Sequence, residues 1–272
     1  MAKRFDANRT WDEAVRMFRA NRELVLILAG LFFLLPALIA AAFAPEALSG
    51  PQIADPENAG PIVQAWAAEN WVNVLLLQIL QLLGLLSLLA LLARRRPTVS
   101  EAIKDGLAAL LPMVLAQLIV SLLFLLVFGT ILGIFGLAGG AGVILGLIIA
   151  VPLAFYLLAR LSTLTPVFVF EDRRNPIKAI WASWNLTKGA GWRIAGFFAL
   201  LVIAAVVISA VFGLIGTLIT ALMGNDELAL FVSLGLSALI GTVLQAILAC
   251  VLAALYRQLQ AREAPSALEP NA

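Results

Sequence analysis

A few polar side chains that could bind a ligand lie deep inside long apolar stretches of this chain. Gln81 and Gln245 each stand near the middle of an uncharged run. Such an amide can line a substrate cavity, or it can hydrogen-bond to a neighbouring helix. Both interpretations stay open, and the second is favoured because no acid or base accompanies the amides at that depth. Other polar residues in these runs are Gln78, Gln117, Ser121, Thr130, Ser233, Ser237 and Thr242.

Residues for the common catalytic arrangements are missing from the sequence. The chain has no histidine and one cysteine, Cys250, which lies in an apolar run. Their absence excludes Ser-His-Asp and Cys-His catalysis, the commonest zinc ligand and a disulfide framework. No phosphate-binding loop, nucleotide fingerprint or metal constellation is present either. The sequence therefore predicts a protein that is not an enzyme, with no catalytic residues, no metal and no cofactor.

A second group of residues has side chains that favour contact with a membrane surface. Indole rings favour the boundary between hydrocarbon and headgroups, and basic side chains attract anionic headgroups there. We predict that one short stretch contacts lipid in this way, although its tryptophans could instead pack inside the protein. The residues are Lys178, Trp181, Trp184, Lys188, Trp192 and Arg193.

Arg160 and Glu171 form a candidate structural ion pair. The segment between them carries no charge and contains Pro166, which disfavours a straight helix just before it. A segment that folds back would bring the guanidinium onto the carboxylate. The alternative, which has equal weight, is that Arg160 extends to the lipid headgroups without a partner.

These residues require a membrane-spanning scaffold. Of the 272 residues, 62% are hydrophobic and only 12% are charged, against about 25% charged in a typical soluble domain. A charge at mid-bilayer costs about 2.5–3.5 kcal/mol, so uncharged runs locate the spans. We expect one polytopic membrane domain over 1–260 and a short disordered tail over 261–272. The six predicted spans are 23–44, 71–93, 111–134, 142–163, 193–216 and 228–256.

The basic residues fall on one side of these spans. Lysine and arginine are absent from the segments 45–70, 135–141 and 217–228, and the first and third of these carry acids instead. By the positive-inside rule, both termini are expected in the cytoplasm.

Each predicted hairpin follows a short amphipathic stretch with helix-capping signals. The apolar residues of each stretch recur at helical spacing and would share one face. The predicted fold class is therefore all-α integral membrane, with three hairpins that are each preceded by a cytoplasmic amphipathic helix, as a parallel pseudo-threefold repeat. Two glycine pairs, Gly129 with Gly133 and Gly142 with Gly146, are candidates for helix contacts. The capping pairs are Thr10 with Glu13, Thr98 with Glu101, and Asn175 with Pro176.

The most distinctive segment is RLSTLTPVFVFEDRRNPIKAIWASWNLTKGAGWR, from Arg160 to Arg193. It resembles part of the membrane domain attached to some bacterial glycerophosphoryl diester phosphodiesterases, which also occurs as stand-alone membrane proteins. The opening FDANRTWDEAVRMFRAN and the closing LYRQLQ look similar too. The matching residues in the segment are Arg160, Pro166, Glu171, Ala179, Ser183, Trp184, Leu186, Thr187, Lys188 and Gly189.

The resemblance implies a bacterial inner-membrane module rather than an activity. The phosphodiesterase proper resembles a TIM barrel with catalytic histidines, acids and a divalent metal, and this chain has neither a barrel-sized soluble segment nor a histidine. We predict a non-catalytic module that associates with membrane lipids, including anionic headgroups, or organises membrane partners, without binding nucleic acid. The alternative is a small carrier for a lipid or amphiphile. A polar cavity that reaches Gln81 and Gln245 would favour the carrier, and a dry, packed centre would favour the module.

Overall fold

The computed structural model describes residues 5–42, 61, 64–66, 68–93, 98–172, 174–223 and 227–263. Among these residues, six helices are long and apolar enough to cross a membrane. Each overlaps one predicted span, so the all-α membrane class and the six spans are confirmed. The candidate spans are Arg22–Ala40, Trp71–Ala93, Val99–Gly136, Gly139–Phe170, Gly191–Met223 and Phe231–Arg262.

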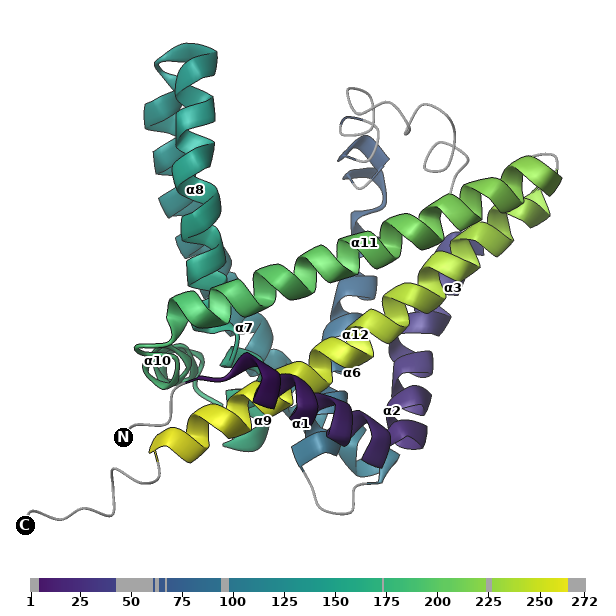
Figure 1. Ribbon diagram of the computed structural model, residues 1–272, viewed down its shortest axis with the longest axis horizontal. Helices are drawn as coiled ribbons and strands as arrows, with labels where there is room; N and C mark the ends of the chain where they lie inside the picture. The colour runs from purple at the N-terminus through teal and green to yellow at the C-terminus, as the bar shows by residue number, and fades with distance from the viewer. Residues whose placement is uncertain are drawn as a thin grey trace, which may run out of the picture.

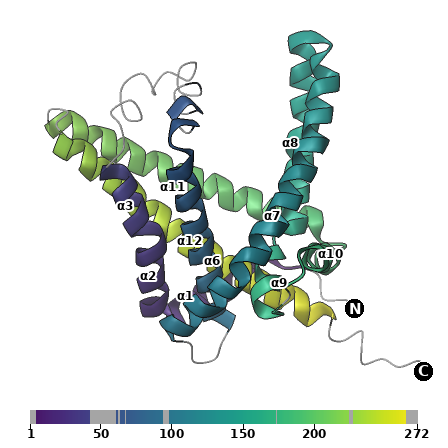
Figure 2. The same ribbon diagram turned by 180° about the vertical axis from the view of Figure 1, so that it is seen from behind.

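The spans are arranged so that the short helices gather at one end of the molecule. Helices α7 (Val99–Gly136) and α8 (Gly139–Leu161) form a tall hairpin whose turn lies far from α1 (Ala7–Ala20), as Figures 1 and 2 show. Helices α11 (Gly191–Met223) and α12 (Glu227–Glu263) lie against each other. We call the end that holds α1 and the last turns of α12 the terminal end. Helices α9 (Leu164–Phe170) and α10 (Pro176–Leu186) also lie there.

The first span changes its helical geometry just before Pro36. It begins as α2 (Arg22–Ala29), passes through the π-helical turn η1 (Gly30–Leu34) and continues as α3 (Leu35–Ala42). Proline lacks an amide N–H and crowds the preceding turn, so the wider turn lets the helix continue. Phe32 and Phe33 of η1 are buried where η1 packs on α6 (Trp71–Ala93).

Two predicted caps are confirmed and one is wrong. Thr98 and Glu101 form a capping box at the start of α7, and Asn175 caps α10 with Pro176 in its first turn. The α1 cap is Asp6 rather than Thr10, because the Asp6 carboxylate accepts from two amides of the first turn.

The three amphipathic stretches join their spans differently. Helix α1 is separate from α2, and α10 is separate from α11. The second stretch is instead continuous with the third span, since α7 runs through Pro112 without a break. The pseudo-threefold repeat stays a prediction.

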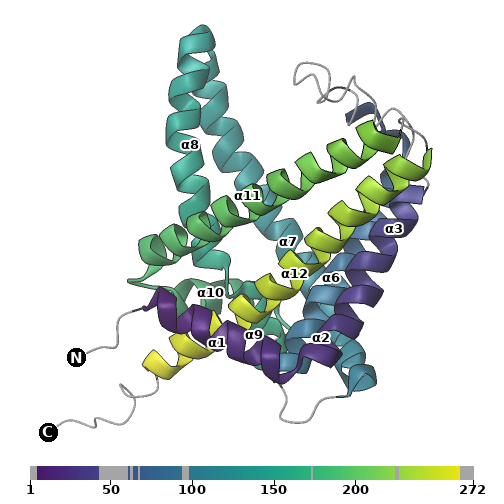
Figure 3. The same cartoon turned by 45° about the vertical axis from the view of Figure 1, so that its right-hand side comes forward.

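Helix α1 is attached to the last turns of α12 by polar contacts, as Figure 3 helps to follow. The Gln258 amide donates to the Asp6 carbonyl at 2.9 Å, and a guanidinium nitrogen of Arg257 lies 4.0 Å from a Glu13 carboxylate oxygen. The side chain of Arg16 also donates to Glu13, and this hydrogen bond raises the pKa of Arg16 above its ordinary value. These contacts fix the position of α1 at the terminal end.

Some of the residues on which the predicted orientation and the predicted disordered tail depend lie outside the described residues. Helix α12 continues to Glu263, so 261–263 are helical, whereas 264–272 are not described. The cytoplasmic location of the termini therefore stays a prediction. Other undescribed residues include Glu46, Asp55, Glu57, Arg94, Arg95, Arg96 and Asp226.

Candidate functional site

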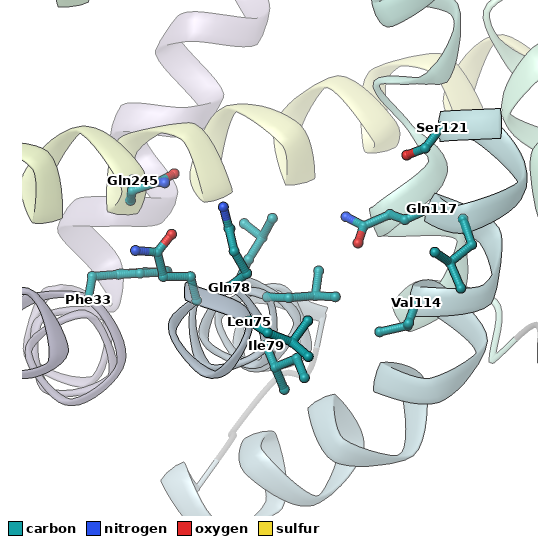
Figure 4. Close-up of a pocket in the computed structure, with 12 residues that line it drawn as sticks. Phe33, Leu75, Gln78, Ile79, Val114, Gln117, Ser121 and Gln245 are labelled. Carbon is teal, nitrogen blue, oxygen red and sulfur yellow. The ribbon is translucent and has the colours of Figure 1, made fainter. Parts of the chain in front are cut away.

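A cavity of about 400 Å³ lies between four spans, and three of them contribute polar side chains to it. Helix α6 contributes Gln78 and Gln81, α7 contributes Gln117 and Ser121, and α12 contributes Gln245. The cavity is open to the surface, because Gln78, Gln117 and Ser121 are exposed. We call it the glutamine chamber. Figure 4 shows Gln78, Gln117, Ser121 and Gln245 directed toward a common space. The two glutamines singled out in the sequence, Gln81 and Gln245, thus line the same cavity.

Helical spacing explains how each span presents its polar residues. Gln78 and Gln81 are three residues apart, and Gln117 and Ser121 are four apart, so each pair shares one helix face. Gln81 and Gln245 lie near the middle of the spans Trp71–Ala93 and Phe231–Arg262. The chamber therefore lies near the middle of these two candidate spans.

Interhelical hydrogen bonds do not account for these amides. Within the described residues, the side chains of Gln78, Gln81, Gln117 and Gln245 have no hydrogen-bond partner. Hydroxyls elsewhere in the spans behave differently, since Thr130 donates to the Leu126 carbonyl at 2.6 Å on its own helix. An amide without a partner is costly in an apolar medium, so the chamber offers free donors and acceptors to a ligand.

A second cavity, of about 490 Å³, adjoins the first. It lies mainly between α11 and α12 and is lined almost entirely by apolar side chains, so we call it the apolar chamber. Phe33, Gln81 and Gln245 line both chambers. Trp11 of α1 also lines the apolar chamber, which therefore extends toward the terminal end. Among the described residues that line the two chambers, none is charged.

The predicted lipid contacts form an exposed surface at the terminal end. Trp181 and Trp192 are 62% and 67% exposed. Lys178, Lys188 and Arg193 are exposed as well. A shallow cavity of about 380 Å³ beside Lys178 and Trp181 also includes Glu171. Contact of this surface with lipid stays a prediction.

Trp184 differs from the other two tryptophans because it lies under Arg160. The Arg160 guanidinium carbon is 4.1 Å from the centroid of the Trp184 ring, a cation–π geometry. The Arg160 side chain is nearly buried, at 4% residue exposure. Its burial disfavours free extension to the headgroups.

The predicted ion pair between Arg160 and Glu171 stays a prediction. Glu171 accepts a hydrogen bond from the Tyr256 hydroxyl at 2.7 Å, which ties α9 to α12. Arg160 contributes instead through its backbone: its carbonyl accepts from the hydroxyls of Ser183 at 3.1 Å and Thr187 at 3.0 Å. The sequence signal for this contact is the i, i+4 spacing of Ser183 on α10 and Thr187, the C-cap residue of that helix.

Comparison with protein families identifies the C-terminal part of the chain. Residues 137–266 match the family model described as the membrane domain of glycerophosphoryl diester phosphodiesterase. The match contains the whole segment from Arg160 to Arg193, so the resemblance predicted from that segment is confirmed. No catalytic domain is evident. Searches of curated proteins and of solved structures gave no match.

Proposed function

We propose that this protein is a non-catalytic membrane module that binds a lipid or another amphiphile in the glutamine chamber. The observation that carries the proposal is the convergence of five polar side chains from α6, α7 and α12 on one cavity at mid-span. Their amides have no protein partner within the described residues. An unpaired amide in hydrocarbon is costly, and the polar end of a ligand would offset that cost.

The rest of the lining favours a ligand that dissolves in the bilayer. Leucine, isoleucine and valine side chains complete the glutamine chamber, and an apolar chamber adjoins it. A proton- or ion-coupled transporter usually places an ionisable group at this depth. The described residues that line the two chambers include no ionisable group, so coupled transport of small ions is disfavoured.

A carrier for the same amphiphile is the second candidate function. A polar cavity that reaches both Gln81 and Gln245 favours it. A dry, packed centre would instead have favoured a purely structural module. A bacterial inner-membrane location with cytoplasmic termini belongs to the proposal, because the charge distribution and the family match support it.

The binding proposal is tested by the lipids that co-purify with the full chain in mild detergent. Mass spectrometry should find one amphiphile retained in constant molar ratio to wild-type protein. The double variant Gln78→Leu/Gln117→Leu should lose it, because both amides leave the chamber. The variant Thr130→Val is the matched control, since Thr130 lies on α7 outside both chambers and bonds its own helix.

The contrary results are specific. Equal retention by the double variant would mean that the retained lipid lies elsewhere on the surface. Absence of any amphiphile in constant ratio from wild-type protein would remove the proposed function.

A further inference from the structure

We infer that the ligand is an uncharged amphiphile with a single hydrocarbon chain, whose polar end lies in the glutamine chamber and whose chain lies in the apolar chamber. The inference rests on the proposed function and adds the ligand class. It follows from three features of the two chambers: their shared residues, their charge and their size.

The shared residues place the polar end of the ligand. Gln81 and Gln245 line both chambers, so one molecule can occupy both and contact these amides where the chambers meet. Each amide has two N–H donors and a carbonyl acceptor. A hydroxyl, carbonyl or amide group on the ligand would satisfy them and would recover the hydrogen bonds that it loses on leaving water.

The charge of the chambers excludes an ionised headgroup. A phosphate or carboxylate at this depth would need a cationic partner, because an isolated charge in an apolar medium is far more costly than a neutral polar group. The lining residues supply amides and hydroxyls but no lysine or arginine. The basic residues described near α1 and α10, such as Arg257 and Lys178, lie at the terminal end instead.

The size of the apolar chamber suits one hydrocarbon chain. Small residues of α3, α11 and α12 contribute to its lining: Ala37, Ala204, Ala205, Ala238 and Gly241. Its volume and that of the glutamine chamber, about 490 and 400 Å³, each lie within the range of about 300–1,000 Å³ that is typical of small-molecule sites.

Trp11 marks the part of the apolar chamber at the terminal end. It is 41% exposed and belongs to α1, which Thr10 and Glu13 attach to α12. Indole rings favour the headgroup boundary. The chain of the ligand therefore lies between that boundary and the middle of the bundle.

The test compares two probes that differ by one phosphate group and therefore in charge: 1-oleoylglycerol and 1-oleoyl-lysophosphatidate. Binding of each to the full chain in neutral detergent is titrated by native mass spectrometry. We expect 1-oleoylglycerol to bind at least tenfold more tightly. The double variant Gln81→Leu/Gln245→Leu should weaken it by about tenfold or more, since two hydrogen-bonding groups are lost.

A separate pair of variants tests whether the hydrocarbon chain of the ligand lies in the apolar chamber. Ala205→Trp fills the apolar chamber and should weaken 1-oleoylglycerol by about tenfold or more. Val207→Trp on the same helix is the control, because Val207 is 56% exposed and does not line the chamber. It should leave the affinity unchanged. Thermal unfolding in the same detergent identifies any variant that fails to fold.

Each contrary outcome removes a different statement. Equal or tighter binding of the phosphate probe, still weakened by Gln81→Leu/Gln245→Leu, would overturn the uncharged ligand class and leave the proposed function intact. Binding of 1-oleoylglycerol that neither the glutamine nor the Ala205 variant changes would overturn the two-chamber site. Failure of both probes, together with no amphiphile co-purifying with wild-type protein, would remove the proposed function itself.

Discussion

The hydroxyl of Thr10 lies 3.0 Å from the side-chain carbonyl oxygen of Gln258, to which it donates. The two residues are at opposite ends of the sequence, and Thr10 is fully buried. The contact joins α1 to the last turns of α12 and so positions Trp11 over the apolar chamber.

Removal of this contact should loosen α1. We expect Thr10→Val to lower the free energy of unfolding by about 1 kcal/mol, because it removes this partly buried hydrogen bond without changing the side-chain volume much. Gln258→Leu should cost more, because it also removes the hydrogen bond from the Gln258 amide to the Asp6 carbonyl. The double variant should cost less than the sum of the two. Unfolding by denaturing detergent, followed by circular dichroism, gives the coupling energy, and additive effects would show that the bond contributes nothing.

Glycines in the spans should respond to substitution according to the space around them. A Cβ on Gly106 would lie 2.9 Å from the Ser87 backbone nitrogen, whereas Gly129 on the same helix has open space around it. We expect Gly106→Ala to destabilise the fold by about 1–3 kcal/mol through overpacking against α6. Gly129→Ala should be neutral or stabilising, by up to about 1 kcal/mol, because alanine favours helix. Equal effects in thermal unfolding would contradict the packing of α6 on α7.

Arg160 and Trp184 should be energetically coupled. We expect a double-mutant cycle with Arg160→Met and Trp184→Leu to give a coupling of about 0.5–2 kcal/mol, the range for cation–π pairs. A parallel cycle with Glu171→Gln tests the predicted ion pair. If Arg160 couples to Glu171 and not to Trp184, the carboxylate rather than the indole is its main partner.

The spans and two of the three caps could be predicted from the sequence because their causes are local. A charge inside a span is costly wherever the span packs, and Thr98 or Asn175 caps a helix with groups three residues away. The α1 cap was predicted wrongly because Asp6 and Thr10 are both good capping residues. The choice depended on Gln258, far along the chain.

Contacts between helices could not be predicted in this way. Helical spacing puts Gln117 and Ser121 on one face, but only packing brings that face to Gln78 and Gln245. Of the two candidate glycine pairs, Gly129 and Gly133 have open space around them, whereas Gly142 and Gly146 lie close to Phe135 of α7. The same short motif therefore marks a close helix contact in one place and not in the other, and the sequence alone does not separate the two.

Topology can be tested with residues at the two ends of the structure. Leu137, in the turn between α7 and α8, is 90% exposed, and Lys178 lies on α10 at the terminal end. In a Cys250→Ala background, we expect Leu137→Cys to react with an impermeant thiol reagent in intact cells, because the positive-inside rule puts this turn outside. Lys178→Cys should react only after the membrane is opened. The reverse pattern would invert the proposed orientation.

The last prediction concerns the depth of the tryptophans on and beside α10. Trp181 and Trp192 are exposed, whereas Trp184 is covered by Arg160. In a chain with Trp11, Trp66 and Trp71 replaced by Phe, one indole at a time is kept in liposomes that contain brominated lipids. We expect shallow bromines to quench Trp181 and Trp192 more strongly than Trp184, because these two rings are free to contact headgroups.

Varying the charge of the lipid and of the protein distinguishes contact with anionic headgroups from simple exposure of the indole rings. Lys178, Lys188 and Arg193 accompany the exposed rings, and each basic residue near an anionic surface contributes about 1 kcal/mol. Removal of anionic lipid should therefore weaken the shallow quenching of Trp181 and Trp192, and Lys178→Gln/Lys188→Gln should have the same effect in anionic liposomes. Trp184 is the internal control, since the Arg160 contact does not depend on the lipid. Quenching of all three indoles that ignores both lipid charge and the lysine substitutions would show that this surface does not select anionic headgroups.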